Sequence, residues 1–247
     1  MIRGLYTSAS GMSSNLEQND TISNNLSNLN TNGYKKQVAT KHEFPSYLLH
    51  RIDQQVTPTG KIGSGVMVDE IKTDHSNGSF KKTGNTFDWA VQGEGFFAVQ
   101  TPQGERYTRN GEFTLNDQGQ VVTQDGHPVL GENGILQVPF EGEISVDNNN
   151  NLLVDGGIVD HIRITGFENK NGLSREGSNL FEATPEVDNI FPATGGVVQG
   201  HLEESNVNPI DEMVRMINNT RNYEANQKGI QAHDDTMGKA VNEVGRT

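Results

Sequence analysis

The sequence of 247 residues contains no cysteine and few aromatic residues. Without thiols the chain can form neither disulfides nor thiolate nucleophiles, and it cannot bind zinc or iron–sulfur clusters through cysteine. Aromatic residues make up 6% of the chain and hydrophobic residues 32%, whereas glycine occurs 28 times. We therefore expect no dense core and expect turns and polar faces to account for much of the chain.

Basic residues and long apolar runs are also scarce. Lys and Arg number 19 against 32 Asp and Glu, for a formal net charge of −13, so we expect no nucleic-acid partner. No run approaches the roughly 18 apolar residues that span a bilayer, and we expect no membrane insertion. The segment MIRGLYTSASGM (1–12) lacks the apolar stretch of a secretory signal peptide, so we expect no cleaved signal.

Apolar residues recur every three or four positions near both ends of the sequence, which is the spacing of an α-helix. The first stripe predicts a helix from Ile2 to Leu29 that ends before the Asn32-Gly33 pair. The second stripe predicts a helix that begins at Pro209, with Asn208 as its N-cap. Because each stripe is narrow, we expect the two helices to pair and to bury both stripes.

Between these helices the apolar spacing changes to two, in short runs such as GFFAVQT (95–101) and QVVTQ (120–124). Asn-Gly pairs at 77–78, 110–111, 133–134 and 171–172 predict hairpin turns with positive φ at glycine. The predicted fold is a mainly β domain with long N- and C-terminal α-helices that pair as a coiled-coil-like inner domain. Its predicted segments are an N-terminal helix (1–35), an extended connector (36–85), an acidic all-β domain (86–203) and a C-terminal helix (204–247).

No motif in the sequence predicts catalysis. Gly93, Gly95 and Ala98 match a dinucleotide-binding pattern by letter, but a strand with two buried Phe residues is expected after them instead of the required helix. Residues 147–151 imitate the start of a calcium loop without its later Gly and Glu, which leaves a solvated turn or a looser calcium site as alternatives. The seven His residues lack metal-site spacing. We expect no catalytic residue, cofactor or metal.

Asn24, Asn25 and Asn28 lie beside the first apolar stripe, although each costs up to about 0.7 kcal/mol relative to Ala inside a helix. Their amides therefore predict hydrogen-bond partners outside that helix. A pair of helices with so little apolar area is marginal alone. We expect mobile ends in the monomer that become ordered when many copies stack.

Several motifs of the sequence resemble those of bacterial flagellar rod and hook proteins, in the same order. They are MIRGLYTSASGM (1–12), ISNNLSNLNTNGYK (22–35), DWAVQGEGFF (88–97), YTRNGEF (107–113), GHLEESNVN (200–208) and RNYEAN (221–226).

The resemblance implies a structural subunit, not an enzyme, that polymerises helically into the hollow axial drive shaft joining the flagellar motor to the hook. The implied partners are copies of itself, other flagellar rod and hook subunits, and the flagellar export apparatus. The implied location is the basal-body rod in the cell envelope, reached through the flagellar channel without a cleaved signal peptide. The length favours a proximal or distal rod protein over a hook protein.

The residues expected to pack between subunits are apolar residues of the two stripes and asparagines of the signatures. They are Leu5, Met12, Leu16, Ile22, Asn24, Asn25, Leu26, Asn28, Leu29, Asn30, Asn206, Ile210, Met213, Ile217, Tyr223, Asn226 and Ile230. Two other functions stay open at this point. One is a soluble β module that binds carbohydrate or protein and is dimerised by its terminal helices. The other is a β-fold hydrolase, for which the sequence nominates no acid/base pair.

Overall fold

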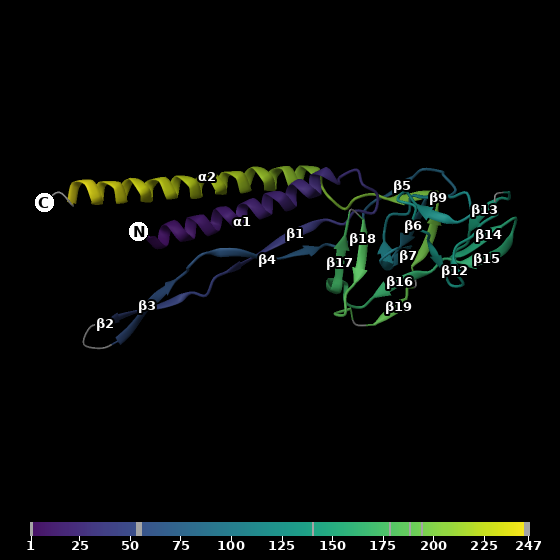
Figure 1. Ribbon diagram of the computed structural model, residues 1–247, viewed down its shortest axis with the longest axis horizontal. Helices are drawn as coiled ribbons and strands as arrows, with labels where there is room; N and C mark the ends of the chain where they lie inside the picture. Colours follow the sequence, from purple (N-terminus) through teal and green to yellow (C-terminus); the bar gives the residue numbers. More distant parts are fainter. Residues whose placement is uncertain are drawn as a thin grey trace. The chain divides into compact units, whose positions relative to one another are not determined.

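A computed structural model describes residues 2–52, 56–139, 141–177, 179–187, 189–193 and 195–244. The protein is mostly β, with one long helix near each end of the chain, and the two helices pack together as predicted (Figure 1). The chain divides into two compact units. Unit 1 consists of Met1–Ser27, Gln37–Thr73 and Asn208–Thr247, and unit 2 consists of Asn28–Lys36 and Asp74–Val207.

Two antiparallel helices form one part of unit 1 (Figure 1). They are α1 (Ile2–Ser27) and α2 (Pro209–Lys239), and α2 is continued by a π-helical turn (Ala240–Val244). The predicted start of α2 is confirmed, because Asn208 Oδ1 accepts hydrogen bonds from the N–H groups of Ile210 and Asp211 at 3.0 and 3.4 Å. In the described residues, neither helix is both long enough and apolar enough to cross a bilayer.

Two pairs of antiparallel strands complete unit 1, within the segment predicted as an extended connector. They are β1 (Gln37–Glu43) with β4 (Val66–Thr73), and β2 (Tyr47–Ile52) with β3 (Val56–Ile62). Strands β1 and β4 pack against α1. Apolar burial in this unit is sparse, because among its described residues Ile22 is the one hydrophobic side chain that is fully buried.

Unit 2 contains many short antiparallel strands. They are β5 (Phe80–Lys82), β6 (Trp89–Gln92), β7 (Phe96–Thr101), β8 (Gly104–Thr108), β9 (Phe113–Leu115), β10 (Val121–Thr123), β11 (Leu130–Gly131), β12 (Gly134–Ile135), β13 (Ile144–Val146), β14 (Asn151–Val154), β15 (Gly157–His161), β16 (Ile164–Phe167), β17 (Leu173–Glu176), β18 (Leu180–Ala183), β19 (Ile190–Pro192), β20 (Gly196–Gln199) and β21 (His201–Glu203), with a 3₁₀ turn at Lys170–Gly172. The largest sheet has the strand order β17-β18-β8-β7-β16-β19.

Strand β7 separates two hydrophobic cores in unit 2. Phe97 and Val99 belong to a core with Trp89, while Phe96 and Ala98 belong to a second core. This follows from the two-residue period of a strand, in which successive side chains point to opposite faces. The strand with two buried Phe residues, expected in place of a nucleotide-binding helix, is therefore confirmed.

The predicted Asn-Gly turns are only partly correct. Gly134 has φ +119° in the hairpin between β11 and β12. Gly78, Gly111 and Gly172 do not have positive φ, so for them the predicted reason was wrong. Gly78 and Gly111 are instead needed for close approach, because a Cβ at either position would overlap a backbone carbonyl oxygen, and Gly172 ends the 3₁₀ turn.

Candidate functional site

A stripe of apolar side chains on α2 is exposed. Ile210, Met213 and Ile217 are 69%, 51% and 52% exposed, and together with Val214 they form what we call the outer stripe. Leu16 of α1 is exposed to the same degree. The expectation that pairing of the helices buries both apolar stripes is therefore wrong for these residues.

The reason is that α2 presents a different, polar face to α1. This face consists of Glu212, Asn219, Asn226 and His233, spaced seven residues apart, and we call it the polar seam. Residues seven apart on a helix lie on the same face, two turns from each other. Glu212 and Asn219 are fully buried, whereas the side chains of the outer stripe point elsewhere.

Hydrogen bonds join one half of the polar seam to α1. Asn25 Nδ2 donates to Glu212 Oε2 at 3.2 Å. Asn219 Nδ2 donates to the backbone oxygen of Asn15 at 2.6 Å and to Asn19 Oδ1 at 2.8 Å. Buried polar groups are costly unless they are paired, so these contacts favour one alignment of the helices.

In the other half of the polar seam, side chains of α2 lie against glycines of α1. A Cβ atom on Gly11 would lie 2.8 Å from Asn226 Nδ2, and a Cβ on Gly4 would overlap the ring of His233. The glycines therefore allow α2 to approach α1 closely at these two positions.

The remaining residues of the predicted packing set vary in exposure. Asn24 and Asn30 are exposed, Ile22 and Asn25 are buried, and the others are half-buried, namely Leu5, Met12, Leu26, Asn28, Leu29, Asn206, Tyr223, Asn226 and Ile230.

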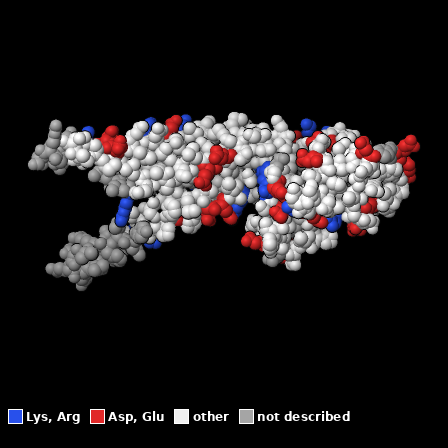
Figure 2. Space-filling model, in the orientation of Figure 1, with Lys and Arg blue, Asp and Glu red and all other residues white. Residues whose placement is uncertain are grey.

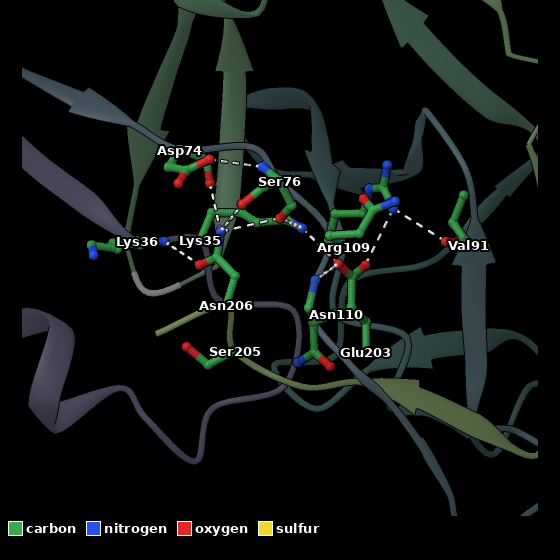
Figure 3. A network of polar contacts seen from close by, with 12 residues as sticks. Lys35, Lys36, Asp74, Ser76, Val91, Arg109, Asn110, Glu203, Ser205 and Asn206 are labelled. Atoms are coloured by element: carbon green, nitrogen blue, oxygen red, sulfur yellow. Dashed lines mark hydrogen bonds and ion pairs between the residues drawn. The ribbon is translucent and has the colours of Figure 1, made fainter. Parts of the chain in front are cut away.

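Two of the predicted asparagines bind their own chain. Asn25 exchanges two hydrogen bonds with the backbone of Gln37, at 2.8 and 2.9 Å. Asn206 Oδ1 accepts from the N–H of Lys36 at 2.7 Å, and its Nδ2 donates to the backbone oxygens of Asp74 and Ser76 (Figure 3). These contacts lie within unit 1 for Asn25 and within unit 2 for Asn206.

A buried group of three charged residues, which we call the ion triad, lies in unit 2 (Figure 3). It consists of Lys35, Arg109 and Glu203. Lys35 Nζ lies 2.6 Å from Glu203 Oε1, and Arg109 NH1 lies 3.2 Å from Glu203 Oε2. Glu203 Oε1 also accepts a hydrogen bond from the N–H of Gly78 at 2.9 Å. One carboxylate thus neutralises part of the charge of two cations.

Backbone oxygens complete the surroundings of both cations. Lys35 Nζ donates to the oxygen of Ser76 at 2.8 Å, and Arg109 donates to the oxygens of Val91 and Gly93 at 3.2 and 2.7 Å. Burial lowers the pKa of Lys35, although the adjacent Glu203 carboxylate opposes the shift. Burial likewise lowers the pKa of Arg109.

Sequence reasoning missed the ion triad. Lys35, Arg109 and Glu203 each lie inside a quoted motif, but they are 94 to 168 residues from their partners. No local pattern in the sequence links the three residues, because each charge finds its partner far along the chain.

His75 lies beside the ion triad against two aromatic rings. Its ring centre is 5.7 Å from that of Phe96 and 5.4 Å from that of Phe181. Burial, reinforced by the positive charges of Lys35, Lys170 and Arg109, lowers its pKa to about 4. The imidazole is therefore neutral near pH 7.

The face drawn in Figure 2 is mainly uncharged, with acidic side chains more frequent than basic ones. Across the described parts of the chain, no group of three or more His, Asp or Glu side chains could hold a metal ion. At the loop where a looser calcium site stayed open, Asp147 instead accepts hydrogen bonds from the backbone of Asn149 and from Asn151, which closes the turn.

Comparison with known proteins decides the family. The model "Flagella basal body rod protein" matches residues 5–35, "Flagellar hook protein FlgE/F/G D1 domain" matches 90–159, and "Flagellar basal body rod FlgEFG protein C-terminal" matches 198–243. The "Flagellar basal-body rod protein FlgG" of Bacillus subtilis (strain 168) is 33% identical over 264 residues, which cover 98% of this chain and 99% of that protein. The chain belongs to the flagellar basal-body rod protein family.

Other relatives agree with this assignment. A protein of the same name from Borreliella burgdorferi is 35% identical over 266 residues, covering 98% of both chains. The "Flagellar hook-basal body complex protein FlhO" of Bacillus subtilis is 31% identical over 277 residues, covering the whole of both chains. The family is one of structural proteins. Each member of the ion triad lies in a different matched segment of this rod protein.

Proposed function

We propose that this chain is a structural subunit of the flagellar basal-body rod, in which the paired terminal helices form a coiled-coil-like inner layer of a hollow helical polymer. The observation that carries the proposal is the exposed outer stripe of α2, in a chain that matches rod proteins over its whole length. That match favours a rod subunit over a dimeric binding module or a hydrolase.

The energetics of unit 1 support polymerisation. Complete burial of a fully exposed Ile or Met side chain stabilises by about 1.5–3 kcal/mol. The side chains of the outer stripe are 51–69% exposed, so burying them between copies contributes roughly half to two-thirds of that value each. Unit 1 has almost no fully buried apolar residue of its own among those described, and such a helix pair is marginal alone. Neighbouring copies supply the missing apolar contacts.

The exposed residues are the first candidates for contacts between copies. We assign Leu16, Ile210, Met213 and Ile217 to apolar packing and Asn24 and Asn30 to inter-subunit hydrogen bonds. The half-buried members of the predicted set contribute their remaining exposed surface. A contact that is repeated head to tail without closing produces a helical array of subunits.

The remaining assignments follow from this arrangement. The acidic β domain (86–203) faces outward, and the connector (36–85) links it to the terminal helices. The chain assembles with copies of itself and with other rod and hook subunits. It reaches the rod in the cell envelope unfolded, through the flagellar export apparatus, without a cleaved signal peptide.

A single charge on the outer stripe tests the proposal. In a strain that lacks the gene, electron microscopy of basal bodies should show rods that stop short and carry no hook, rescued by the full chain. Ile217→Asp should fail to rescue, because an aspartate cannot be buried against an apolar neighbour. Asn218→Asp, which adds the same charge at the neighbouring exposed position, is the matched control and should rescue.

Failure of this variant to assemble has to be distinguished from failure to fold. Circular dichroism of the purified Ile217→Asp chain should match that of the unmodified chain, since Ile217 is 52% exposed and does not belong to the buried polar seam. Intact rods and hooks in the strain that lacks the gene, or full rescue by Ile217→Asp, would overturn the proposed assembly.

A further inference from the structure

We infer that the polar seam is a register lock, which makes α2 select the α1 helix of its own chain in one alignment. The inference rests on the proposed function, because it concerns the same helices within the polymer. In such a polymer each α2 is surrounded by identical helices from other copies. Apolar stripes alone discriminate poorly between these neighbours and between alignments, whereas buried polar side chains can specify partner and register.

The contacts of the seam follow one constant alignment. Glu212 meets Asn25, Asn226 meets Gly11 and His233 meets Gly4. Each step of seven residues toward the C-terminal end of α2 is thus matched by seven residues toward the N-terminal end of α1. Asn219, between Glu212 and Asn226, bonds Asn15 and Asn19, which flank the position that this alignment requires.

A slip of seven residues in one direction removes the hydrogen-bond partners of Asn219. It would place Asn219 opposite Gly11 and Asn226 opposite Gly4, and it would move Glu212 from Asn25 to Gln18. Asn219 would then lose both of its hydrogen bonds while its side chain remained in the interface. A buried amide without a partner disfavours this alignment.

A slip in the other direction removes the partner of Glu212. Asn226 would lie opposite Gln18, the position that Asn219 faces in the native alignment. Glu212 would pass beyond Ser27, the last residue of α1, and would lose its hydrogen bond to Asn25. The seam therefore opposes both slips, because each slip removes a hydrogen bond that a buried seam residue makes in the native alignment.

The absence of cysteine makes the alignment measurable by disulfide formation. The native alignment places Ser8 against Gly229, since a Cβ on Gly229 would lie 3.3 Å from Ser8 Oγ. Ser8→Cys with Gly229→Cys therefore reports the native register. Ser8→Cys with Asn222→Cys and Ser8→Cys with Thr236→Cys report the two slipped registers, because these positions lie seven residues to either side.

Each cysteine pair is placed in three backgrounds of the full chain. These are the unmodified seam, the seam with Asn219→Leu and Asn226→Leu, and the control Asn218→Leu, which replaces an exposed asparagine outside the seam. After mild oxidation of the purified chain and of isolated basal bodies, mass spectrometry of the bridged peptides separates bonds within one chain from bonds between differently labelled copies.

With the unmodified seam and with Asn218→Leu, we expect the native pair to dominate and to form within one chain. In the Asn219→Leu, Asn226→Leu background, we expect the slipped pair Ser8→Cys with Asn222→Cys and the bonds between copies to rise about tenfold relative to the native pair, which is the population change that one unsatisfied buried amide represents. An unchanged bridging pattern in that background would overturn the inference. So would absence of the native bridge from both preparations.

Failure of the inference is separable from failure of the proposed function. If the unmodified chain never enters basal bodies, the rod assignment fails, and the purified chain still reports its register. If the chain with the unmodified seam restores rods and motility but its bridging pattern does not respond to the two Leu substitutions, the register lock fails and the rod assignment stands.

Discussion

Lys35 Nζ and Glu203 Oε1 are 2.6 Å apart, with 1% and 0% of the two side chains exposed. The pair joins a residue that follows the first helix to a residue that precedes the second, and Arg109 shares the same carboxylate. Removing one partner of a buried ion pair leaves the other charge uncompensated, which costs more than the pair itself contributes.

Glu203→Ala should therefore lower the free energy of unfolding of unit 2 by about 3–5 kcal/mol, because it leaves two buried cations without their carboxylate. The fluorescence of Trp89, the single tryptophan and a fully buried core residue, reports this unfolding in denaturant. The matched control is Glu204→Ala. Glu204 accepts a hydrogen bond from Ser79 at an exposed site, and its loss should cost at most about 1 kcal/mol. Equal losses for the two variants would contradict the role of the triad.

Gly33→Ala should lower the free energy of unfolding of unit 2 by at least about 3 kcal/mol. Alanine is strained in the left-handed backbone at this position, and its Cβ would overlap the peptide bond between Arg109 and Asn110. Gly33 has φ +69°, and a Cβ there would lie 2.7 Å from the backbone oxygen of Arg109 and closer still to the next peptide. Gly84 has a similar φ of +76° with open space around it. Gly84→Ala should therefore cost only about 1–2 kcal/mol, from the backbone alone. Denaturant titration of both variants measures the difference.

The stability of unit 2 should fall as the pH is lowered from about 6.5 to about 4, because His75 has a pKa of about 4 in the folded chain. Between these values the unfolded chain binds a proton that the folded chain does not bind. The stabilisation is complete above pH 6.5, and its loss approaches about 3 kcal/mol near pH 4.

Replacing His75 tests this pH dependence. His75→Phe keeps an aromatic ring beside Phe96 and Phe181. It should remove most of the loss of stability between pH 6.5 and 5, a range above that in which carboxylates titrate. Trp89 fluorescence in denaturant at each pH provides the measurement. His127→Phe is the control and should retain the loss. The same slope in the His75→Phe chain would exclude His75 as its origin.

Two glycines of unit 1 should respond to substitution with opposite signs. Gly238→Ala should stabilise α2 by up to about 1 kcal/mol, because no atom lies within 4 Å of an added Cβ and alanine favours the helix. Gly11→Leu should weaken the helix pair by about 2 kcal/mol, because Asn226 occupies the space that the side chain needs. Far-UV circular dichroism during thermal unfolding compares the two. A stabilising Gly11→Leu would contradict the close approach of the helices.

Local features were the most predictable from the sequence. The Asn208 cap depends on a side chain and the two N–H groups that follow it, and the strand at Phe96 depends on a two-residue period. The apolar periodicity identified both helices, but it did not identify which face of α2 meets α1. The choice of the polar seam depends on glycines 4 and 11, more than 200 residues earlier in the chain.

Long-range polar contacts were the least predictable. Lys35, Arg109 and Glu203 are charged residues of a kind that is rarely fully buried, and only the folding of unit 2 brings them together. In the same way, the asparagines beside the first stripe indicated partners outside the helix. The sequence did not indicate which residues these partners are, and Asn25 finds one of them in Gln37 of β1. A single sequence contains no signal that specifies such pairs.

The ion triad also has a mechanical consequence. Chain connectivity means that a load on α1 enters unit 2 through residues 28–36, and a load on α2 enters it through residues 204–207. Both routes meet at Lys35 and Glu203, which are bonded to each other across the chain. In a rod subunit, a load that enters unit 2 through either of these two segments is therefore passed to the other through the Lys35–Glu203 pair.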